Sequence, residues 1–252
     1  MEQSLINAGQ ENFSLPHDVV QLPTGGIFYK HKKKSLKVGY LTANDENILM
    51  NAGTNTKDGI VLSLLKNKIY EHDVKPEDLL DADIEALLIF LRNSSFGPEY
   101  TLTLKDPSTG KDFTSTILLD ELNINKGQSN PNEDGTFTTV LPKTGVTVKL
   151  KPLTFGEKLE IEKMVESYPL GRVAPRVTWT LNKNILEIDG NPDRQQISLF
   201  IETLPIMDSK HIRKFIRENI PSLDLSRQVL APSGEVVSVD INFGVEFFRV
   251  FF

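Results

Sequence analysis

The chain has 252 residues, of which 39% are hydrophobic and 25% charged, an ordinary globular composition with room for one large or two modest domains. Its net charge of −6 argues against nucleic acid as the main ligand, because phosphate binding requires a basic face. The absence of cysteine excludes disulfides, thiolate metal sites and cysteine nucleophiles.

The start of the chain has neither the basic nor the apolar region of a signal peptide. No apolar run approaches the ~18–20 residues that a membrane span needs. We therefore expect no membrane span, and a location in a cytoplasm or in a particle assembled there. Residues 1–20 are polar and unpatterned, which predicts an N-terminal arm that is disordered alone or tied down by a partner.

Two stretches, residues 22–49 and 141–161, share one order of parts. Each opens with Leu-Pro and a Gly turn, continues through a lysine-containing strand with apolar residues at every second position, and closes with Leu-Thr before an acidic helix start. Thr42 and Thr154 are the predicted helix caps, and Glu157 completes a capping box in the second stretch. We interpret both as one strand-turn-capped-helix unit used twice; the alternative is a coincidence of common turn residues.

Between the two stretches, the spacing of apolar residues changes from helical to alternating. Two amphipathic helices that pair in a core are predicted, followed by a hairpin around the turn at residues 106–110. The second helix is expected to start in the region of Asp81 and Asp83 and to stop near Gly97. The two apolar stripes comprise Ile60, Val61, Leu64, Leu65 and Ile69, and then Ile84, Leu87, Leu88 and Leu91.

The second half of the chain is predicted to contain further helices, around residues 197–201 and 212–216, and a closing hairpin around the turn at 232–234. Because no β-α-β periodicity is present, we predict an α+β fold of short antiparallel hairpins combined with amphipathic helices. The predicted organisation is an arm (1–20), a first strand unit with helix pair and hairpin (21–124), a linker loop (125–135), and a second strand unit with helices and a C-terminal hairpin (136–252).

The search for chemistry yields one weak candidate. The four histidines are far apart, and no metal-binding, nucleophile or nucleotide motif occurs. Residues 130–135 copy the first six positions of a calcium loop, but Leu141 stands where a bidentate glutamate is required. We predict no catalytic residue, no metal and no cofactor. A carboxylate- or calcium-dependent enzyme with a site near residues 130–135 remains the alternative.

The order of motifs resembles the baseplate hub assembly proteins of T-even-like contractile-tailed bacteriophages (myoviruses). The resemblance rests on LPTGGIFY near the start, LLIFLRNSSFGPEY at residues 87–100, a hairpin, the second Leu-Pro-strand-Leu-Thr unit and VEFFR near the end. It implies a non-enzymatic tail protein, a baseplate hub component or a hub assembly factor. It also implies other phage baseplate or tail proteins as partners, and a location in the host cytoplasm during assembly or in the tail baseplate of the virion. A generic soluble scaffold protein is a further alternative.

One departure from that family concerns the hairpin tips. Many relatives carry CPxCG-type knuckles there, whereas the turns at residues 106–110 and 231–234 keep Pro and Gly without any thiolate. The resemblance therefore implies that any family zinc is absent and that turn geometry holds these tips.

The C-terminus carries five aromatic residues in its last ten positions. Alternation along a strand cannot hide them all on one face, so they need two apolar surroundings, or one shared with another molecule. Two readings stay open: the rings fill the protein's own core, or they bind a partner. The candidate partner-binding residues are Phe243, Phe247, Phe248, Phe251 and Phe252.

Overall fold

The computed structural model describes residues 16–50, 57–243 and 245–248. Helices combine with small antiparallel sheets of two or three strands, which confirms the predicted α+β class. The strands are β1 (His17–Gln21), β2 (Ser35–Gly39), β3 (Glu99–Lys105), β4 (Asp112–Leu118), β5 (Ile124–Asn125), β6 (Phe137–Val140), β7 (Thr147–Leu150), β8 (Ile185–Ile188), β9 (Ser222–Leu223), β10 (Ser226–Leu230) and β11 (Val236–Asp240). The helices are α1 (Ala43–Met50), α2 (Lys57–Lys68), α3 (Asp81–Phe96), α4 (Phe155–Glu166), α5 (Arg176–Asn184), α6 (Arg194–Glu202), α7 (Ile206–Asn219) and α8 (Val245–Phe248), with short 3₁₀ helices η2 (Pro76–Asp78) and η3 (Leu119–Glu121).

The first unit, residues 17–118, begins with the antiparallel hairpin β1–β2. The hairpin loop opens at Leu22, whose N–H donates to the carbonyl oxygen of Lys34 at 2.8 Å. Helices α1 and α2 follow, and Ile69, directly after α2, forms an antiparallel bridge with Val38 of β2. Helix α3 then leads into the hairpin β3–β4.

The second unit, residues 137–241, repeats this order of elements. The hairpin β6–β7 has a loop that opens at Leu141, whose N–H donates to the carbonyl oxygen of Val146 at 2.9 Å. Helices α4 and α5 follow, and Ile185, directly after α5, pairs with Leu150 of β7. Helix α6 stands where the first unit has the short η2, and α7 leads to the hairpin β10–β11.

The helix start after the second hairpin is capped in the predicted manner, whereas at the first hairpin the hydroxyl of Thr42 donates a hydrogen bond instead of accepting one. In the second unit Thr154 and Glu157 form a complete capping box, in which the Glu157 N–H donates to the threonine hydroxyl at 3.2 Å. In the first unit the Asp45 carboxylate accepts hydrogen bonds from the N–H and the hydroxyl of Thr42, at 2.7 and 2.6 Å. Each bond satisfies a backbone or side-chain donor that the first helical turn would otherwise leave unpaired.

A buried aspartate at the third position of a later helix fixes each Leu-Pro loop. Asp83 of α3 accepts from the N–H and the hydroxyl of Thr24, at 3.0 and 2.6 Å. Asp208 of α7 accepts from the N–H groups of Lys143 and Thr144, at 2.8 and 3.0 Å. Both aspartates are fully buried. A coincidence of turn residues does not account for two buried carboxylates with the same task, so the predicted repeat extends over both halves of the chain.

Helix α3 starts at Asp81, as predicted, but the side-chain cap expected from the region of Asp81 and Asp83 is not formed. Its N-cap is Leu80, which makes no side-chain capping bond, whereas Gly97 with φ of 81° ends the helix where expected. Asp83 does not cap α3, because its carboxylate is taken up by Thr24 and by the hydroxyl of Tyr29. A carboxylate that binds a distant loop was not visible from local sequence.

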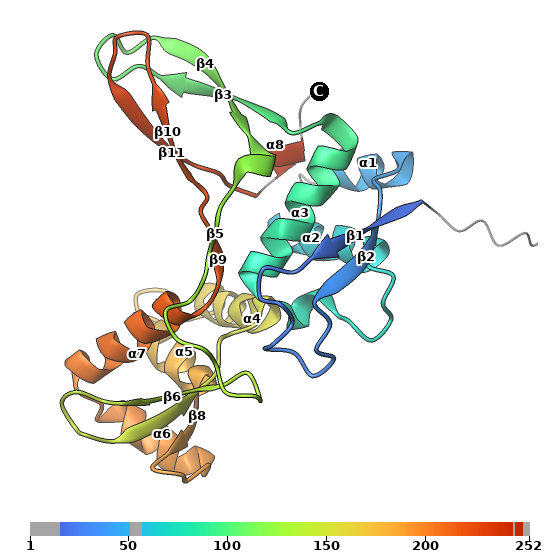
Figure 1. Ribbon diagram of the computed structural model, residues 1–252. Helices are drawn as coiled ribbons and strands as arrows, with labels where there is room; N and C mark the ends of the chain where they lie inside the picture. Colours follow the sequence, from blue (N-terminus) through green and yellow to red (C-terminus); the bar gives the residue numbers. More distant parts are fainter. Residues whose placement is uncertain (1–15, 51–56, 244, 249–252) are drawn as a thin grey trace, which may run out of the picture.

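The side chains pack into two cores, and the chain visits the first core twice. The second core is built from residues 137–216 with Phe28 and Ile220 at its edge. Segment 222–248, which contains the last hairpin of the second unit, packs with the first half of the chain, so the packing groups residues differently from the predicted division at 136–252 (Figure 1). The first core contains both predicted helix stripes, Ile60, Val61, Leu64, Leu65, Ile69, Ile84, Leu87, Leu88 and Leu91, together with Val229, Ile241, Phe247 and Phe248.

The two crossings between the cores run side by side as β5 and β9, which pair antiparallel (Figure 1). The connection is tight at Gly127, where an added Cβ would lie 2.0 Å from the carbonyl oxygen of Asn219. Only glycine allows this approach. At the other end of the chain, β1 begins at His17, so the last four residues of the predicted arm lie in a strand, while residues 1–15 lie outside the described residues.

Candidate functional site

The aromatic C-terminus was the sequence-predicted partner site, and two of its five residues are in the protein's own core. Phe247 is 0% and Phe248 3% exposed, and Phe243 is half-buried. The Phe247 ring contacts the rings of Phe243 and Tyr100, with centroids 4.9 and 5.4 Å apart. At Phe247 and Phe248 the core interpretation therefore applies. Phe251 and Phe252 lie outside the described residues.

Arg92 of α3 attaches this C-terminal segment to the first unit. Its guanidinium group is buried and donates to the carbonyl oxygens of Phe247, Gly97 and Glu99, at 3.1, 2.8 and 2.9 Å. It also lies over the ring of Tyr100, 5.0 Å from the centroid, a favourable cation–π position. Burial lowers the pKa of Arg92 from its usual value. A lone arginine inside an otherwise apolar helix stripe was the sequence signal for this contact.

The hairpins β3–β4 and β10–β11 together form an arm that extends away from the helices (Figure 1). We call these four strands the hairpin arm. The tips of the two hairpins meet at Asp106, whose carboxylate accepts from the N–H groups of Ser108 and Thr109 in its own turn and from Ser233 N–H in the other tip, at 2.9, 3.2 and 3.1 Å. The hydroxyl of Ser108 donates to Glu235 at 2.6 Å.

Asp106 thus connects the two turns that the sequence singled out for their missing thiolates. Burial raises the pKa of Asp106, but the hydrogen bonds from Ser233 and from the turn N–H groups outweigh this, so that the pKa is lowered and the carboxylate stays ionised. The sequence predicted that turn geometry holds each tip. That the two tips meet at one carboxylate follows only from the tertiary structure.

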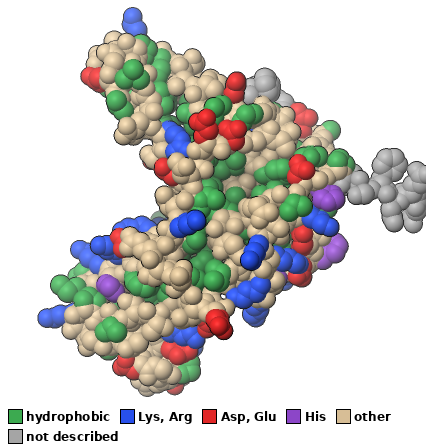
Figure 2. Space-filling view, viewed as in Figure 1, with side chains coloured by type: hydrophobic (Ala, Val, Ile, Leu, Met, Phe, Trp, Pro, Cys, Tyr) green, Lys and Arg blue, Asp and Glu red, His purple; other side chains and the backbone are tan. Residues whose placement is uncertain are grey.

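The hairpin arm exposes apolar side chains at its surface. Figure 2 shows that the molecule is hollowed between the hairpin arm and the remainder of the second unit. The outer face of β3 and β4 is a ladder of threonines, in which the hydroxyls of Thr101 and Thr116 lie 3.0 Å apart. The large exposed apolar residues of the arm are Leu118, Leu230 and Val236.

The calcium-like loop at residues 130–135 is occupied by contacts within the protein. Hydrogen bonds from Thr136, and then the neighbouring Lys149 ammonium group, lower the pKa of Asp134 to about 2. Asn132 donates its side-chain amide to the Thr136 hydroxyl at 3.1 Å. The Asp134 carboxylate therefore attaches the loop to Lys149 of β7. Within residues 16–50, 57–243 and 245–248, no three His, Cys, Asp or Glu side chains are grouped so that they could hold a metal ion.

The start of α4 rests on the first unit. The N–H of Phe155 donates to the carbonyl oxygen of Leu79 at 2.7 Å, and Lys158 forms an ion pair with Asp81. Gly156 makes this approach possible, because a Cβ there would lie 2.9 Å from the Cβ and the carbonyl oxygen of Glu77. These contacts fix the second unit against the first.

A cavity of about 360 Å³ lies beside this contact, between α3, α4, α5 and α7. Leu80, Leu153 and Ile216 supply part of its apolar lining, and charged side chains reach it from both units. Burial, and then the nearby Asp81 carboxylate, raise the pKa of Glu85 in its wall to about 7. The cavity therefore contains a carboxylate that titrates near neutral pH, which the sequence did not single out.

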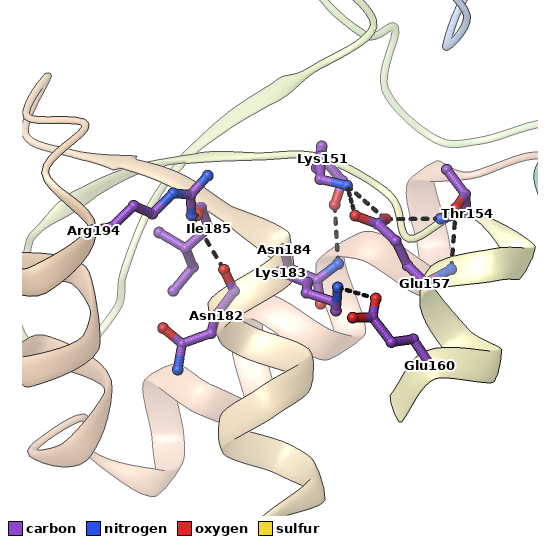
Figure 3. Close-up of polar contacts among 9 residues, drawn as sticks. All are labelled: Lys151, Thr154, Glu157, Glu160, Asn182, Lys183, Asn184, Ile185 and Arg194. Atoms are coloured by element: carbon purple, nitrogen blue, oxygen red, sulfur yellow. Dashed lines mark hydrogen bonds and ion pairs between the residues drawn. The ribbon is translucent and has the colours of Figure 1, made fainter. Parts of the chain in front are cut away.

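Helix α4 is held in the second unit by a polar network (Figure 3). Lys151 lies 2.5 Å from the carboxylate of Glu157, and Lys183 of α5 donates to Glu160 at 2.7 Å. The side-chain amide of Asn184 donates to the carbonyl oxygen of Lys151 at 2.9 Å. Arg194 similarly ties α6 to the end of α5 through the carbonyl oxygen of Ile185 at 2.8 Å (Figure 3). Helix α4 thus belongs to the second unit through this network and contacts the first unit through its first turn.

Four buried charged groups, Asp83, Arg92, Asp106 and Asp208, bond to backbone groups of their own chain and so serve the fold. In a comparison with protein families, residues 26–249 match the family described as T4 bacteriophage base plate protein, and the chain belongs to that family. It is a structural protein of the phage tail baseplate and makes contacts with other tail proteins. No curated protein and no solved structure matches the chain. In the part of the chain that the structure describes, no helix is both long and apolar enough to cross a membrane.

Proposed function

We propose that the chain acts in the hub of the baseplate, as a hub component or as a hub assembly factor, and that it does so by non-enzymatic contacts with other tail proteins. The observation that carries the proposal is the family match over residues 26–249. The order of motifs that resembles hub assembly proteins supports the hub as the place of action.

The architecture supports a role as a connector. Two units of the same plan are joined by the paired crossings β5–β9 and by the contact of Phe155 with Leu79, which gives the chain two separate cores with surfaces facing different directions (Figure 1). The hairpin arm adds a third surface with exposed Leu230 and Val236. Exposed apolar side chains of this kind mark protein interfaces when they are grouped.

Quantitative mass spectrometry of purified virions and of isolated assembly intermediates tests the proposal. A hub component is present in virions in a fixed ratio to other baseplate proteins. An assembly factor is present in the intermediates, found in the host cytoplasm, and absent from virions. A chain that is in neither fraction, in a phage whose tails form normally without the gene, refutes both forms of the proposal.

A further inference from the structure

The contact between the two units has a counterpart on the second unit that α4 cannot occupy. Asp83 and Asp208 stand at the third position of α3 and α7, and this fixes which residues correspond. The start of α3 and the turn before it, residues 77–82, are here named the first seat. The same counting assigns residues 202–207 to the second unit, and we name them the second seat. Asp81 and Ala82 thus correspond to Ile206 and Met207.

The first seat is covered by the first turn of α4. Leu79 accepts the Phe155 N–H, Asp81 pairs with Lys158, and Gly156 lies against Glu77. In this seat Leu79, Leu80 and Ala82 are buried, and the two leucines belong to the first core. Three positions of α4 make the contact. The first is a large apolar residue, the second is a small one, and the fourth is a lysine whose charge is opposite to that of the first residue of α3.

The second seat likewise contains the turn before a helix and the start of that helix, but two of its apolar side chains are in solvent. Ile206 is 73% and Met207 59% exposed. The stability of α7 does not call for these residues, because the first turn of a helix favours carboxylates, as at Asp81, and isoleucine is a weaker helix former than the straight-chain residues. Neighbouring exposed apolar side chains are instead a feature of surfaces that bind other proteins.

The chemistry of the chain decides which occupant fits. In a second copy of this chain the helix equivalent to α4 is α1, whose exposed face carries Ala43, Asn44 and Glu46. Glu46 stands at the fourth helical position, where α4 has Lys158. Docking of α1 would bring this carboxylate onto Ile206 without a partner, and it would join two chains that each carry a net charge of −6. A second copy is therefore a poor match.

From these observations we propose that the second seat binds the first turn of an amphipathic helix of another protein. By analogy with α4, that helix has a large apolar residue at its first position and a small one at its second, but an apolar residue at its fourth position, opposite Ile206. The inference rests on the proposed function, since it names one of the contacts through which a tail protein acts.

Site-specific photo-cross-linking tests the proposal in infected cells. Met207 is replaced by benzoylphenylalanine in a chain supplied to a phage that lacks its own copy, and the cross-linked residues are mapped by mass spectrometry. The control is the same replacement at Val19 of β1, which is 56% exposed and so matches Met207 in accessibility. We expect cross-links from position 207 to fall on the first turn of a helix in one other tail protein.

A second substitution shows whether the apolar contact causes the cross-link. Ile206→Asp restores the residue type of the first seat, so the variant should melt at the wild-type temperature. It should reduce cross-linking from position 207 about tenfold, which corresponds to roughly 1.4 kcal/mol at an interface. Met207→Glu, with the cross-linker placed at position 206, is the second variant should Ile206→Asp fail to fold.

Several results overturn the inference. Cross-links to a second copy of this chain, cross-links spread over many proteins as at Val19, and the absence of cross-links each do so, and so does undiminished cross-linking in Ile206→Asp. The proposed function is judged separately: if Ile206→Asp supports normal tail formation while deletion of the gene does not, the second seat is not an interface but the chain still acts in the baseplate.

Discussion

Asp83 and Asp208 perform the same task in the two units but in different surroundings, so their removal should differ in cost. Asp83→Ala leaves the N–H and hydroxyl of Thr24 and the hydroxyl of Tyr29 without their acceptor, and both of these residues are buried. A buried donor without a partner costs about 1–3 kcal/mol. The two hydroxyls can turn toward other acceptors, so we expect a total loss of about 3–5 kcal/mol.

Asp208→Ala leaves the N–H groups of Lys143 and Thr144 and the hydroxyl of Thr144 without an acceptor. Both residues are exposed, and water can replace the carboxylate. We therefore expect a loss of about 1 kcal/mol, the ordinary net value of a hydrogen bond.

Urea denaturation followed by circular dichroism measures both losses, with Asp120→Ala, an exposed aspartate in η3, as the control expected to stay within about 0.5 kcal/mol of the wild type. Equal losses for Asp83→Ala and Asp208→Ala, or a larger loss for Asp208→Ala, would refute the reasoning from burial.

Three further predictions concern the cavity beside the contact of the two units, the hairpin arm and the C-terminal helix. Glu85 has a pKa of about 7 in the folded chain against an ordinary 4.5, so its ionisation destabilises the fold as pH rises between these values. The difference corresponds to about 3 kcal/mol, of which solvent screening leaves about 1–2. Glu85→Gln should accordingly be more stable than the wild type by that amount at pH 8 but not at pH 4, in urea titrations; an equal effect at both pH values contradicts this. Asp106→Ala should increase amide hydrogen exchange about tenfold at Ser108 and Ser233 together, since both N–H groups lose one acceptor, and a change at Ser108 alone would show that the tips do not meet. Phe247→Ala should lower the free energy of unfolding by about 3–5 kcal/mol, measured by thermal or urea denaturation, because it empties a fully buried site. Leu230→Ala, at an exposed position, should change it by no more than about 0.5 kcal/mol. Similar effects of the two substitutions would contradict the burial of Phe247 in the core.

Much of the local structure could be predicted from the sequence because it depends on neighbouring residues. The cap at Thr154, the stop of α3 at Gly97, and the apolar stripe of α2 are set by spacings of one turn or less. The repeat could also be recognised in part, because the Leu-Pro turns and the capped helices are short motifs.

The remaining features depend on contacts between residues that are distant in the chain. Asp83 looked like a helix-start charge, and only the fold shows that it binds the loop at Thr24. The aromatic C-terminus left core and interface equally open, and the guanidinium group of Arg92 on α3 decides for the core at Phe247. The sequence presents the two hairpin tips as separate turns, and only the fold shows that Asp106 connects them.

The sequence by itself determined the α+β class, the positions of the capped helices and hairpins, and a resemblance to phage baseplate proteins, since each of these depends on local spacing or on the order of motifs. Only the tertiary structure decided that the closing hairpin returns to the first core, that α4 covers the start of α3, and that Ile206 and Met207 are left exposed in the corresponding place. The reason is physical: an apolar pattern specifies that a face must be buried, but not which of the available faces buries it.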